Sequence, residues 1–471
     1  MLSELRSIII LTFFTGLICS DVCSETPNSP TYFKDIAPIF EEHCVTCHRP
    51  GEVAPMSLLG YSQIRPWAKS IKEQVVKKTM PPFHATGPIG QYKNDLRLTE
   101  DEITVISDWV DNNCPKGNSN DFTRTKDWSI EKWPGGEPDY IVKFPRHELK
   151  PSTNDPYVYL FALDEIPENY WVRGFAWHFD SRKYAHHAIA YELPEDAPSP
   201  PEFIYDGHKV GFPKRGGGAA AADYLPGALT RFLPEGSALK IPKGARIYAI
   251  FHYAPTEETV WDEPELGFYL ADGNITKPFR RLDLITEEIT IQPGDAHYEK
   301  IIKGTFQEDG YISDYHVHMH NRGKSATVNL HYPDGRDERI FFMPQFNFDW
   351  QRHYYLTEPK FVPKGTVAEF VAVWDNSADN PFNPDPTATV KYGVFTRNEM
   401  GNANLTYTPV SQMKIPLIVQ NGIELDLAAL KAYIEELTPN ELTAFLPDLR
   451  PDQVEIVTKI WNSKNNPTKK P

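Results

Sequence analysis

Two cysteines and a histidine stand together near the N-terminus, in the stretch Cys44-Val45-Thr46-Cys47-His48. Cys-x-x-Cys-His is the attachment signal for a c-type haem, in which the thiols form thioethers and the imidazole takes one axial site on the iron. A zinc site would need further ligands at suitable spacing, and Cys114 alone does not supply them. A thioredoxin-like redox pair would need a βαβ context, whereas these flanks predict helix and loop. The motif therefore predicts one covalent haem.

Residues 31–117 predict a compact helical unit around this motif. Apolar residues recur at helical spacing from Tyr32 to His43, and a second helix is expected from Pro66 to Thr79. Thr99-Glu100-Asp101-Glu102 is a capping box that opens a last helix. The order of helix, haem motif, methionine before prolines and last helix resembles a class I cytochrome c domain. This resemblance implies a small all-α haem domain.

Met80, which precedes two prolines, is the candidate sixth ligand of the iron. A thioether opposite the imidazole of His48 favours reduced iron and raises its potential. The alternative is that Met80 fills the core, which is the usual role of a methionine. Met56 is too close to His48 in sequence to be expected on the opposite haem face. A haem with both axial sites filled transfers electrons and does not bind oxygen.

From Tyr140 to about Tyr407, short alternating runs are separated by Pro, Gly, Asn and Asp. This pattern is typical of all-β sandwiches, and the length of the region suggests two of them. Four of the predicted strands are residues 157–161, 246–251, 326–330 and 367–371. Gly216-Gly217-Gly218 and the four alanines that follow predict a flexible loop.

Histidines occur at three places in this β-rich region: His186-His187, His252, and the alternating set His316, His318 and His320. Residues i and i+2 of a strand share a face, so His318 and His320 can converge on one metal. His186 and His187 would point apart on a regular strand and can share a metal only at a bulge or a strand end. A single histidine such as His252 is more often structural.

Taken in order, these stretches are similar to the copper type II, ascorbate-dependent monooxygenases, which include the peptidylglycine α-hydroxylating and dopamine β-hydroxylating enzymes. The matching stretches are His186-His187, His252-Tyr253, His318-Met319-His320-Asn321-Arg322-Gly323-Lys324 and Glu399-Met400-Gly401-Asn402. The resemblance implies two jelly-roll-like sandwiches that face a cleft. It implies an electron-transfer copper at His186, His187 and His252, and an oxygen-binding copper at His318, His320 and Met400. Imidazole suits copper in both oxidation states, and a thioether favours Cu(I).

The chain also departs from that family. In the peptidylglycine enzymes an arginine two residues before the His-x-His pair grips the substrate carboxylate, and here that position is His316. Asn402 matches the family, but the position of a tyrosine is occupied by Asn404. A glycine-extended peptide is therefore not the expected substrate. His316 shares a strand face with His318 and could replace His320 as a ligand, although the spacing to Gly323-Lys324 favours His318 and His320.

Composition and the N-terminus indicate the compartment. A net charge of −16 and a pI near 5.4 argue against nucleic acid or an anionic membrane as partner. Arg6 and the apolar run from Ile8 to Ile18 predict a signal peptide over residues 1–24, and no later segment is long and apolar enough to span a bilayer. Export, to a bacterial periplasm or beyond, agrees with haem attachment. Cys114 would be left alone, or paired with Cys23 if that residue survives cleavage.

The expected fold is multidomain, with a small all-α cytochrome c domain, two all-β sandwiches and a short C-terminal helical appendage. The expected division is 1–24 signal peptide, 31–117 haem domain, 118–138 linker, 139–285 first sandwich, 286–410 second sandwich, 411–462 helical appendage and 463–471 disordered tail. The expected function is a monooxygenase in which haem passes single electrons from an upstream periplasmic donor to two coppers, and O2 hydroxylates a C–H bond of a small organic molecule. The alternative is a copper–haem electron carrier or copper-binding protein without hydroxylase activity. Phe346, Phe348, Trp350-Gln351 and Tyr354 could line the cleft, but their pattern is more typical of sandwich core.

Overall fold

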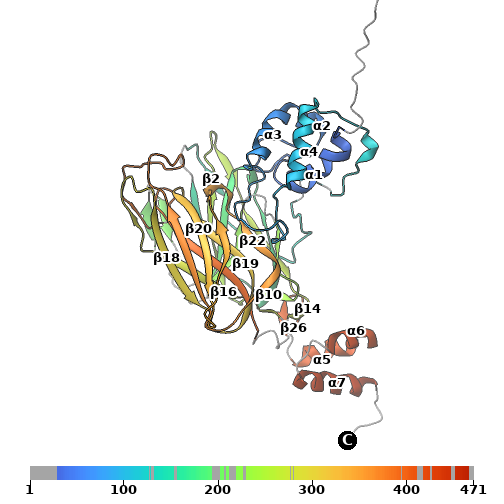
Figure 1. The fold of residues 1–471 in the computed structure, drawn as a ribbon. Helices are drawn as coiled ribbons and strands as arrows, with labels where there is room; N and C mark the ends of the chain where they lie inside the picture. The colour runs from blue at the N-terminus through green and yellow to red at the C-terminus, as the bar shows by residue number, and fades with distance from the viewer. Residues whose placement is uncertain are drawn as a thin grey trace, which may run out of the picture.

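The computed structural model describes residues 29–126, 128, 132–152, 156–193, 202–205, 208–211, 219–225, 230–275, 277–278, 280–393, 395–410, 417–424, 427–446 and 451–465. The protein is mostly β-sheet, with one group of short helices at each end of the described chain (Figure 1). The expected signal peptide lies outside the described residues. Among those that are described, no helix is both long enough and apolar enough to cross a bilayer.

The N-terminal helices pack around their own apolar core. They are η1 (Tyr32–Ile36), α1 (Ala37–His43), α2 (Tyr61–Ile64), η2 (Arg65–Trp67), α3 (Ala68–Val76) and α4 (Glu100–Asp111). Ile36, Phe40, Ile106 and Trp109 are buried in this core. The capping box is confirmed, because the Glu102 amide donates to Thr99 Oγ1 while the Thr99 amide donates to the Glu102 carboxylate. The helices are short, so the likeness to cytochrome c stays a prediction.

A first pair of packed sheets follows. One sheet has the order β1-β13-β4-β10-β15, with β9 also paired to β4, and the facing sheet has the order β3-β11-β5-β8. The strands are β1 (Tyr140–Lys143), β3 (Tyr157–Phe161), β4 (Tyr170–His178), β5 (Ala185–Leu193), β8 (Ala219–Tyr224), β9 (Thr230–Phe232), β10 (Ser237–Ile241), β11 (Arg246–Tyr253), β13 (Glu265–Leu270) and β15 (Lys277–Pro278). Inward residues such as Phe175 and Phe251 form one core between the two sheets.

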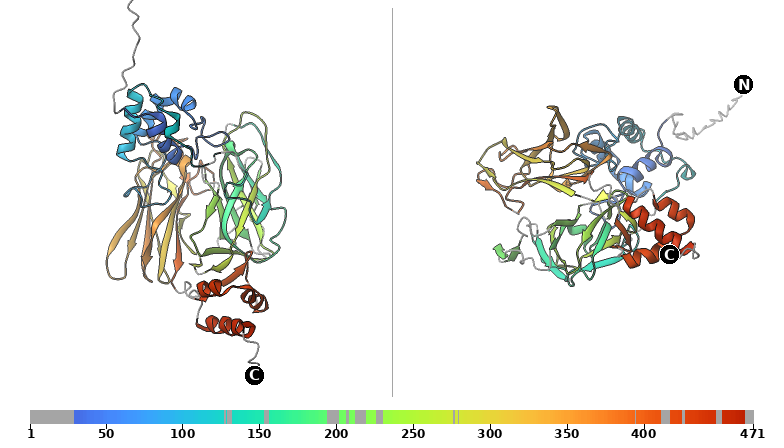
Figure 2. Two further views of the ribbon diagram at one scale, coloured as in Figure 1. Left: turned by 90° about the vertical axis from the view of Figure 1, so that its right-hand side faces the viewer. Right: turned by 90° about the horizontal axis from the view of Figure 1, so that it is seen from below.

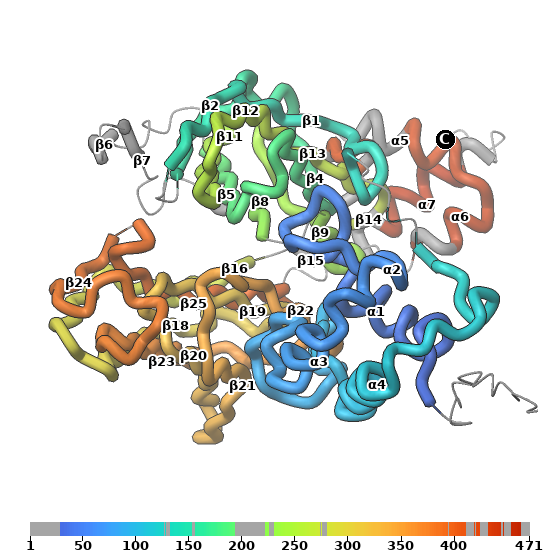
Figure 3. Tube along the Cα trace, turned by 90° about the horizontal axis from the view of Figure 1, so that it is seen from above, coloured from blue at the N-terminus to red at the C-terminus, as the bar shows by residue number. Residues whose placement is uncertain are grey.

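A second pair of sheets has a separate core that includes Met319 and Phe370. The sheet orders are β16-β25-β19-β22 and β18-β23-β20-β21. The strands are β16 (Arg280–Thr286), β18 (Tyr298–Thr305), β19 (Gly310–Met319), β20 (Gly323–His331), β21 (Asp337–Met343), β22 (His353–Val362), β23 (Val367–Trp374) and β25 (Gly401–Pro409). Because β16 pairs with β25, the chain enters the second pair by Arg280, slightly before the expected residue 286. Figure 3 shows the two pairs side by side.

Smaller elements complete the β region. They are the pairs β2 (His147–Leu149) with β12 (Val260–Asp262), β6 (Glu202–Tyr205) with β7 (His208–Gly211), and β17 (Thr290–Ile291) with β24 (Val390–Lys391). The flexible loop expected over Ala219–Ala222 is wrong, because these alanines lie in β8 and pair with β5. Gly216, Gly217 and Gly218 lie outside the described residues.

The expected helical appendage begins later than predicted. Residues 417–424 form the hairpin β26 (Leu417–Gln420) and β27 (Ile423–Glu424), and β26 pairs with β14 (Gly273–Ile275). Asn421 and Gly422 both have positive φ, as a two-residue hairpin turn requires, and Asn-Gly is a strong sequence signal for that turn. The helices then follow as α5 (Leu427–Glu436), α6 (Pro439–Phe445) and α7 (Pro451–Asn465). Helix α7 continues three residues into the stretch expected to be a disordered tail.

The N-terminal helical unit lies against both sheet pairs, at the end of the molecule opposite to α5–α7 (Figure 2). The loop after α3 adds to the second pair: Tyr92 forms an isolated bridge with Leu356, and the Lys93 amide donates to the Tyr355 carbonyl. Phe83 from the same loop is buried in the core of that pair. The helical unit is therefore held to the second pair by backbone pairing and apolar burial.

The stretch expected to be a linker, residues 118–138, packs onto the protein in its described part. It includes η3 (Ser119–Asp121). The amides of Thr125 and Lys126 donate to Glu41 Oε1, at 3.1 and 3.0 Å. Trp133 is buried against the first sheet pair. The composition of this stretch is typical of a linker, but its aromatic side chains find packing partners in the fold.

Candidate metal and haem centre

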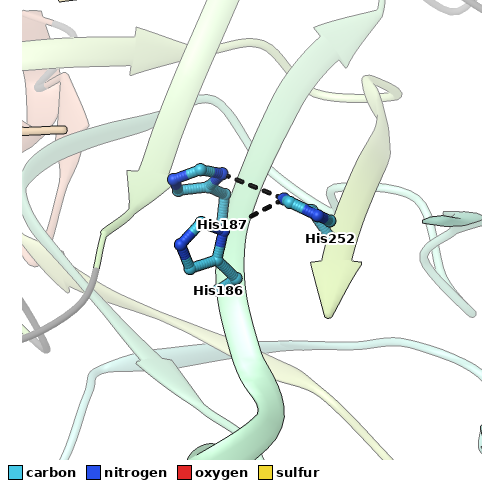
Figure 4. Close-up of side chains that lie close together, drawn as sticks. All are labelled: His186, His187 and His252. Atoms are coloured by element: carbon cyan, nitrogen blue, oxygen red, sulfur yellow. Dashed lines mark hydrogen bonds between the residues drawn. The ribbon is translucent and has the colours of Figure 1, made fainter. Parts of the chain in front are cut away.

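His186, His187 and His252 converge at the edge of the first sheet pair (Figure 4). Strand β11 pairs His252 with His187 and then Tyr253 with Ala185, so the ladder skips His186. This irregularity is the β-bulge that two adjacent histidines require if both are to reach one point. The bulge meets the condition under which the sequence allowed His186 and His187 to share one metal.

The three rings approach one another through their Nδ1 atoms. His252 Nδ1 lies 3.2 Å from Nδ1 of His186 and 3.2 Å from Nδ1 of His187. A neutral imidazole nitrogen carries either a proton or a lone pair, so His252 Nδ1 cannot donate to one neighbour and accept from the other. One metal ion with nitrogen ligands at about 2.0–2.1 Å would set such atoms about 3.3 Å apart in tetrahedral geometry. The spacing therefore fits a metal ion better than a hydrogen-bonded trio.

Burial keeps His187 in the form that binds metals. Desolvation, reinforced by the neighbouring histidines His186 and His252, holds the pKa of His187 well below its usual range. A neutral imidazole presents a lone pair, whereas an imidazolium does not. Three imidazoles at one point suit copper or zinc by ligand type.

His318 and His320 form a second cluster at the end of β19. Their ring centroids are 5.0 Å apart, on one face of the strand, as the i, i+2 spacing predicts. His318 Nδ1 lies 2.5 Å from Gln351 Oε1, and His320 Nδ1 lies 3.2 Å from the Asn398 carbonyl oxygen. Because Gln351 Nε2 donates to the Phe348 carbonyl, the oxygen of this amide is the atom that faces His318. Both Nδ1 atoms are thus hydrogen-bond donors, so the lone pair of each ring is on Nε2.

Strand register places Met400 beside this cluster. In the antiparallel ladder of β19 and β25, His318 faces Asn402 and Met319 faces Gly401. Met400 is the next residue before Gly401, so continuing the register sets it opposite His320. Residues directly opposite in an antiparallel pair have side chains on the same face. The Met400 position is therefore on the histidine face, although it lies one residue beyond the paired strand.

A buried carboxylate holds the corner that carries this cluster. Glu399 Oε2 accepts from the His320 amide and from Trp374 Nε1, both at 2.9 Å, and Oε1 accepts from the Arg322 amide at 2.7 Å. Burial raises the pKa of Glu399 to about 8 against these donors. Glu399 therefore ties the turn after β19 to the residue that precedes Met400, and fixes one histidine relative to the methionine position.

His316 is engaged elsewhere. Its Nδ1 lies 3.2 Å from Asn404 Oδ1, and its ring stacks on His353 with centroids 4.8 Å apart. His353 in turn contacts carboxylates from both sheet pairs, Asp223 and Asp314. Burial lowers the pKa of His316 to about 3. These contacts support His318 and His320, and not His316 and His318, as the ligand pair.

Phe348, in η5 (Phe348–Trp350), lies between the two histidine clusters. Its ring centroid is 5.7 Å from the rings of His186, His187 and His320, and 6.0 Å from that of His252. The side chain is 8% exposed and also belongs to the second core. Phe348 is thus a core residue, as expected, and its ring also contacts both histidine clusters. No periodic pattern distinguishes it from an ordinary core phenylalanine.

A cavity of about 460 Å³ opens beside the first cluster. Its lining includes His186 and His252 from the first sheet pair, Phe348 and Trp350 from the second, and Val53 from the helical unit. Trp350 therefore lines a cavity, as one of the two sequence interpretations allowed. The larger cavity, of about 720 Å³, lies over β21 and β22 and is lined by none of the candidate ligands.

The two cysteines of the Cys44–His48 motif are free thiols. Cys44 and Cys47 are not joined in a disulfide, and Cys114 is buried with its thiol free of a disulfide as well. Burial, followed by the nearby Cys47, raises the pKa of the Cys44 thiol to about 12, opposite to the depressed pKa of reactive redox cysteines. His48 Nδ1 lies 3.2 Å from the Met56 carbonyl oxygen, which leaves Nε2 for an axial bond. These residues fit a c-type haem. Cys19 and Cys23 lie outside the described residues.

Met80, the candidate sixth ligand, is half-buried in the loop after α3. Pro82 and Phe83 follow it and are buried, and Phe83 packs edge-on against Tyr354 of β22. The loop is thus fixed to the second sheet pair a few residues after Met80. Its ligation of iron stays a prediction.

Two contacts that no sequence pattern indicated join the haem motif to the sheets. Glu52 Oε1, in the loop after His48, accepts from Arg182 Nη1 at 3.1 Å, and Arg182 belongs to η4 (Arg182–Tyr184), which leads into His186. Arg352 approaches Cys47 closely enough to lower the pKa of its thiol, and two of its buried nitrogens, Nε and Nη2, have no hydrogen-bond partner among the described residues. Arg352 directly follows Gln351, the partner of His318. Ion pairs between distant segments leave no local signal.

Comparisons with known proteins leave the family open. No family model matches the chain, and no curated protein matches it. Solved structures match only distantly. PNGF-II aligns over 56% of this chain and 65% of its own, with 10% identity and a TM-score of 0.26, so the chain spans about two thirds of that protein. The PBCV-1 virus capsid aligns over 58% and 95%, with 7% identity and a TM-score of 0.24. The major capsid protein P2 from bacteriophage PM2 aligns over 59% and 100%, with 8% identity and a TM-score of 0.21.

Proposed function

We propose that this chain is an exported oxidoreductase of the monooxygenase type that carries one covalent haem c and two copper ions. Residues 31–117 would form a cytochrome c-like domain with Cys44, Cys47, His48 and Met80 around the haem. The two sheet pairs would be the jelly-roll-like copper sandwiches. One copper would bind at His186, His187 and His252, and the other at His318, His320 and Met400. The substrates would be O2 and a small organic molecule.

The observation that carries this proposal is the convergence of three imidazoles at a bulge in β5, where His252 Nδ1 lies 3.2 Å from Nδ1 of His186 and of His187. Such a convergence of buried nitrogen atoms is costly unless a metal ion or shared protons satisfy them. The second cluster lies on the other side of Phe348. It adds two imidazoles whose Nε2 lone pairs could bind a metal. Two sets of imidazoles, one on each side of Phe348, support two metal sites in the same region.

Copper at these sites would supply single-electron chemistry with O2, and the haem would supply electrons one at a time from a periplasmic donor. The chain's own residues do the positioning. Gln351 and the Asn398 carbonyl orient the imidazoles of His318 and His320. Glu399 fixes the corner before Met400. Phe348 excludes water from the space between the two clusters, which raises the strength of electrostatic interactions there.

An electron carrier without hydroxylase activity is the second candidate, and Phe348 is the observation that favours it. A ring that contacts both clusters occupies the space where an open cleft between two coppers was expected. The cavity beside His186 and His252 favours the enzyme, because a carrier has no need of room for an organic molecule. The two candidates share the same metal sites and differ in substrate turnover.

The first test is metal analysis of the mature protein, produced in a host that attaches c-type haem and supplied with excess copper. We expect a copper-to-iron ratio of about 2, falling to about 1 in Met400→Ala/His318→Ala with the haem absorption spectrum unchanged. His297→Ala, at an exposed histidine outside both clusters, is the matched control and should keep the ratio of the unaltered protein. Iron without copper would overturn the proposal, and the histidines would then be structural.

Turnover separates the enzyme from the carrier. With a reduced electron donor and O2 present, copper-dependent product should fall to zero in Met400→Ala while haem content is unchanged. Unchanged product in that variant would remove the second copper from the mechanism. Reversible haem and copper reduction without product from any small organic molecule in a broad panel would support the carrier.

A further inference from the structure

Arg352 buries one edge of its guanidinium without a partner among the described residues. The two nitrogens of this edge, Nε and Nη2, are both buried and accept no neighbour within hydrogen-bond distance there. They are the pair through which an arginine binds a carboxylate with two parallel hydrogen bonds. A buried charge is costly unless it is paired. The unpaired edge therefore indicates a carboxylate that a bound group brings to the protein.

Other buried arginines of this chain have a carboxylate beside them. Arg182 Nη1 donates to Glu52 Oε1 at 3.1 Å, and Arg231 Nη1 donates to Asp223 Oδ1 at 3.0 Å. Both of these ion pairs join distant segments of the chain. Arg352 differs because both nitrogens of its bidentate edge are unpaired among the described residues.

Arg352 lies beside the haem motif and beside the loop that carries Met80. Burial raises the pKa of the Cys47 thiol, which the charge of Arg352 opposes, and burial lowers the pKa of His84, which the same charge lowers further. Coulombic influence falls with distance, so Arg352 is near both side chains. His84 Nε2 is also buried without a hydrogen-bond partner among the described residues. Three buried nitrogens thus lack partners close to the second cysteine of the haem motif.

Contacts between the helical unit and the second sheet pair hold this region in place. Phe83, the residue before His84, packs edge-on against Tyr354 with ring centroids 5.1 Å apart. Asn94 Nδ2 donates to the His353 carbonyl at 2.7 Å. Both contacts are made at the start of β22, which Arg352 directly precedes. The backbone that carries the unpaired edge is therefore fixed against the helical unit.

The chemistry of a c-type haem offers the anion. The group carries two propionate carboxylates, and each vinyl-bearing pyrrole of its porphyrin is next to a propionate-bearing one. A haem attached through Cys47 therefore brings a carboxylate to the same side of the porphyrin as that cysteine. We propose that Arg352, assisted by His84, binds a haem propionate through Nε and Nη2. The inference rests on the haem of the proposed function.

This pairing ties the haem to the second histidine cluster. Arg352 directly follows Gln351, whose Oε1 accepts from His318 Nδ1 at 2.5 Å. Two adjacent residues thus bind the haem and orient an imidazole of the second cluster. The triad is linked to the haem motif through Arg182, which stands four residues before His186. The second cluster is therefore connected to the haem more directly than the triad is.

The first test is the midpoint potential of the haem in the full-length holoprotein. Ferric haem carries one more positive charge than ferrous haem, so a propionate that loses its cationic partner stabilises the ferric form. We expect the equilibrium constant for haem reduction to fall at least threefold in Arg352→Gln, about 28 mV. Arg336→Gln, at an exposed arginine paired with Asp334, is the matched control and should keep the potential of the unaltered protein. An unchanged potential in Arg352→Gln would overturn the proposal.

A label on the haem identifies the anion. Haem made from 5-aminolevulinate labelled with carbon-13 at its carboxyl carbon keeps the label only in the two propionates. In infrared spectra we expect the labelled carboxylate band of one propionate to shift in Arg352→Gln, and that of the other to stay unchanged. If both labelled bands were unchanged, water or a free anion would be the partner of Arg352, and the proposal would be wrong.

Two further variants keep the test decisive if Arg352→Gln attaches no haem. Arg352→Lys keeps the charge but not the bidentate edge, and His84→Gln keeps Arg352 intact. Each should shift the same labelled band, and unchanged bands in both would overturn the proposal. Iron content separates the two levels of inference. Mature protein without covalent haem would sink the proposed haem site and this inference with it, whereas covalent haem with unchanged bands would sink this inference alone.

Discussion

The two histidine clusters present different nitrogen atoms. The triad of His186, His187 and His252 converges through Nδ1, at a bulge between two neighbouring strands. His318 and His320 use Nδ1 to donate to Gln351 and Asn398, and so present Nε2. The first cluster is assembled within one sheet, whereas the histidines of the second depend on partners from two other segments, at Gln351 and Asn398. Two sites with similar ligands can therefore depend on different parts of the fold.

The largest expected effect comes from removing a ligand of the triad. His187→Ala should weaken copper binding at the first cluster by more than roughly 100-fold, because loss of a ligand exceeds the 10–100-fold effect of losing an outer partner. The second cluster should keep its copper, since its ligands and partners are unchanged. Copper titration followed by paramagnetic resonance measures both sites. If His187→Ala lost both coppers, the two clusters would not bind copper independently.

Glu399→Gln tests the corner that belongs to the second cluster alone. Above the pKa of about 8 that burial gives Glu399, its carboxylate accepts from all three N–H groups. An amide group there sets an N–H against one of those donors, and leaving that donor unsatisfied costs about 1–3 kcal/mol of unfolding free energy at such a pH. Denaturant unfolding measures the loss. Copper binding should weaken at the second cluster and stay unchanged at the triad. Equal weakening of copper binding at both clusters would show that Glu399 supports the triad as well.

Gln351→Leu removes the acceptor of His318 without changing a ligand. We expect roughly 10–100-fold weaker copper binding at the second cluster, the usual effect of losing an outer hydrogen-bond partner. Gln307→Leu, at an exposed glutamine that donates to the Thr305 carbonyl, is the matched control. If Gln351→Leu instead weakened copper only at the triad, the assignment of this glutamine to the second cluster would be wrong.

The smallest effect is a pH dependence of the contact between the sheet pairs. Burial and Arg231 oppose protonation of His353, but Asp223 and Asp314 raise its pKa overall. A raised folded pKa stabilises the protein fully below the unfolded value near 6.5, and this contribution is lost as pH rises through the folded pKa. The unfolding free energy of the unaltered protein should therefore decline as the pH rises from the unfolded pKa through the folded pKa of His353. His353→Gln should abolish the decline. The same slope in both proteins would assign the dependence to other groups.

Sequence patterns predicted much of the fold. Four strands and the capping box at Thr99 are confirmed, because alternation and capping are local signals. The same patterns identified the histidines and stated the condition, a bulge, under which His186 and His187 can converge. The hairpin at Asn421-Gly422 had a local signal that the helical interpretation of the C-terminal region overlooked.

Types of residue and their order along the chain were therefore enough to name the candidate ligands. Tertiary structure alone decided their partners: Phe348 between the clusters, Gln351 on His318, Glu52 on Arg182, and the cavity that opens toward the triad. Each of these contacts joins segments far apart in sequence, where side-chain identity carries no information about which distant group will be adjacent. Packing and strand register fix those distances, because a shift of one residue turns every side chain of a strand to the other face.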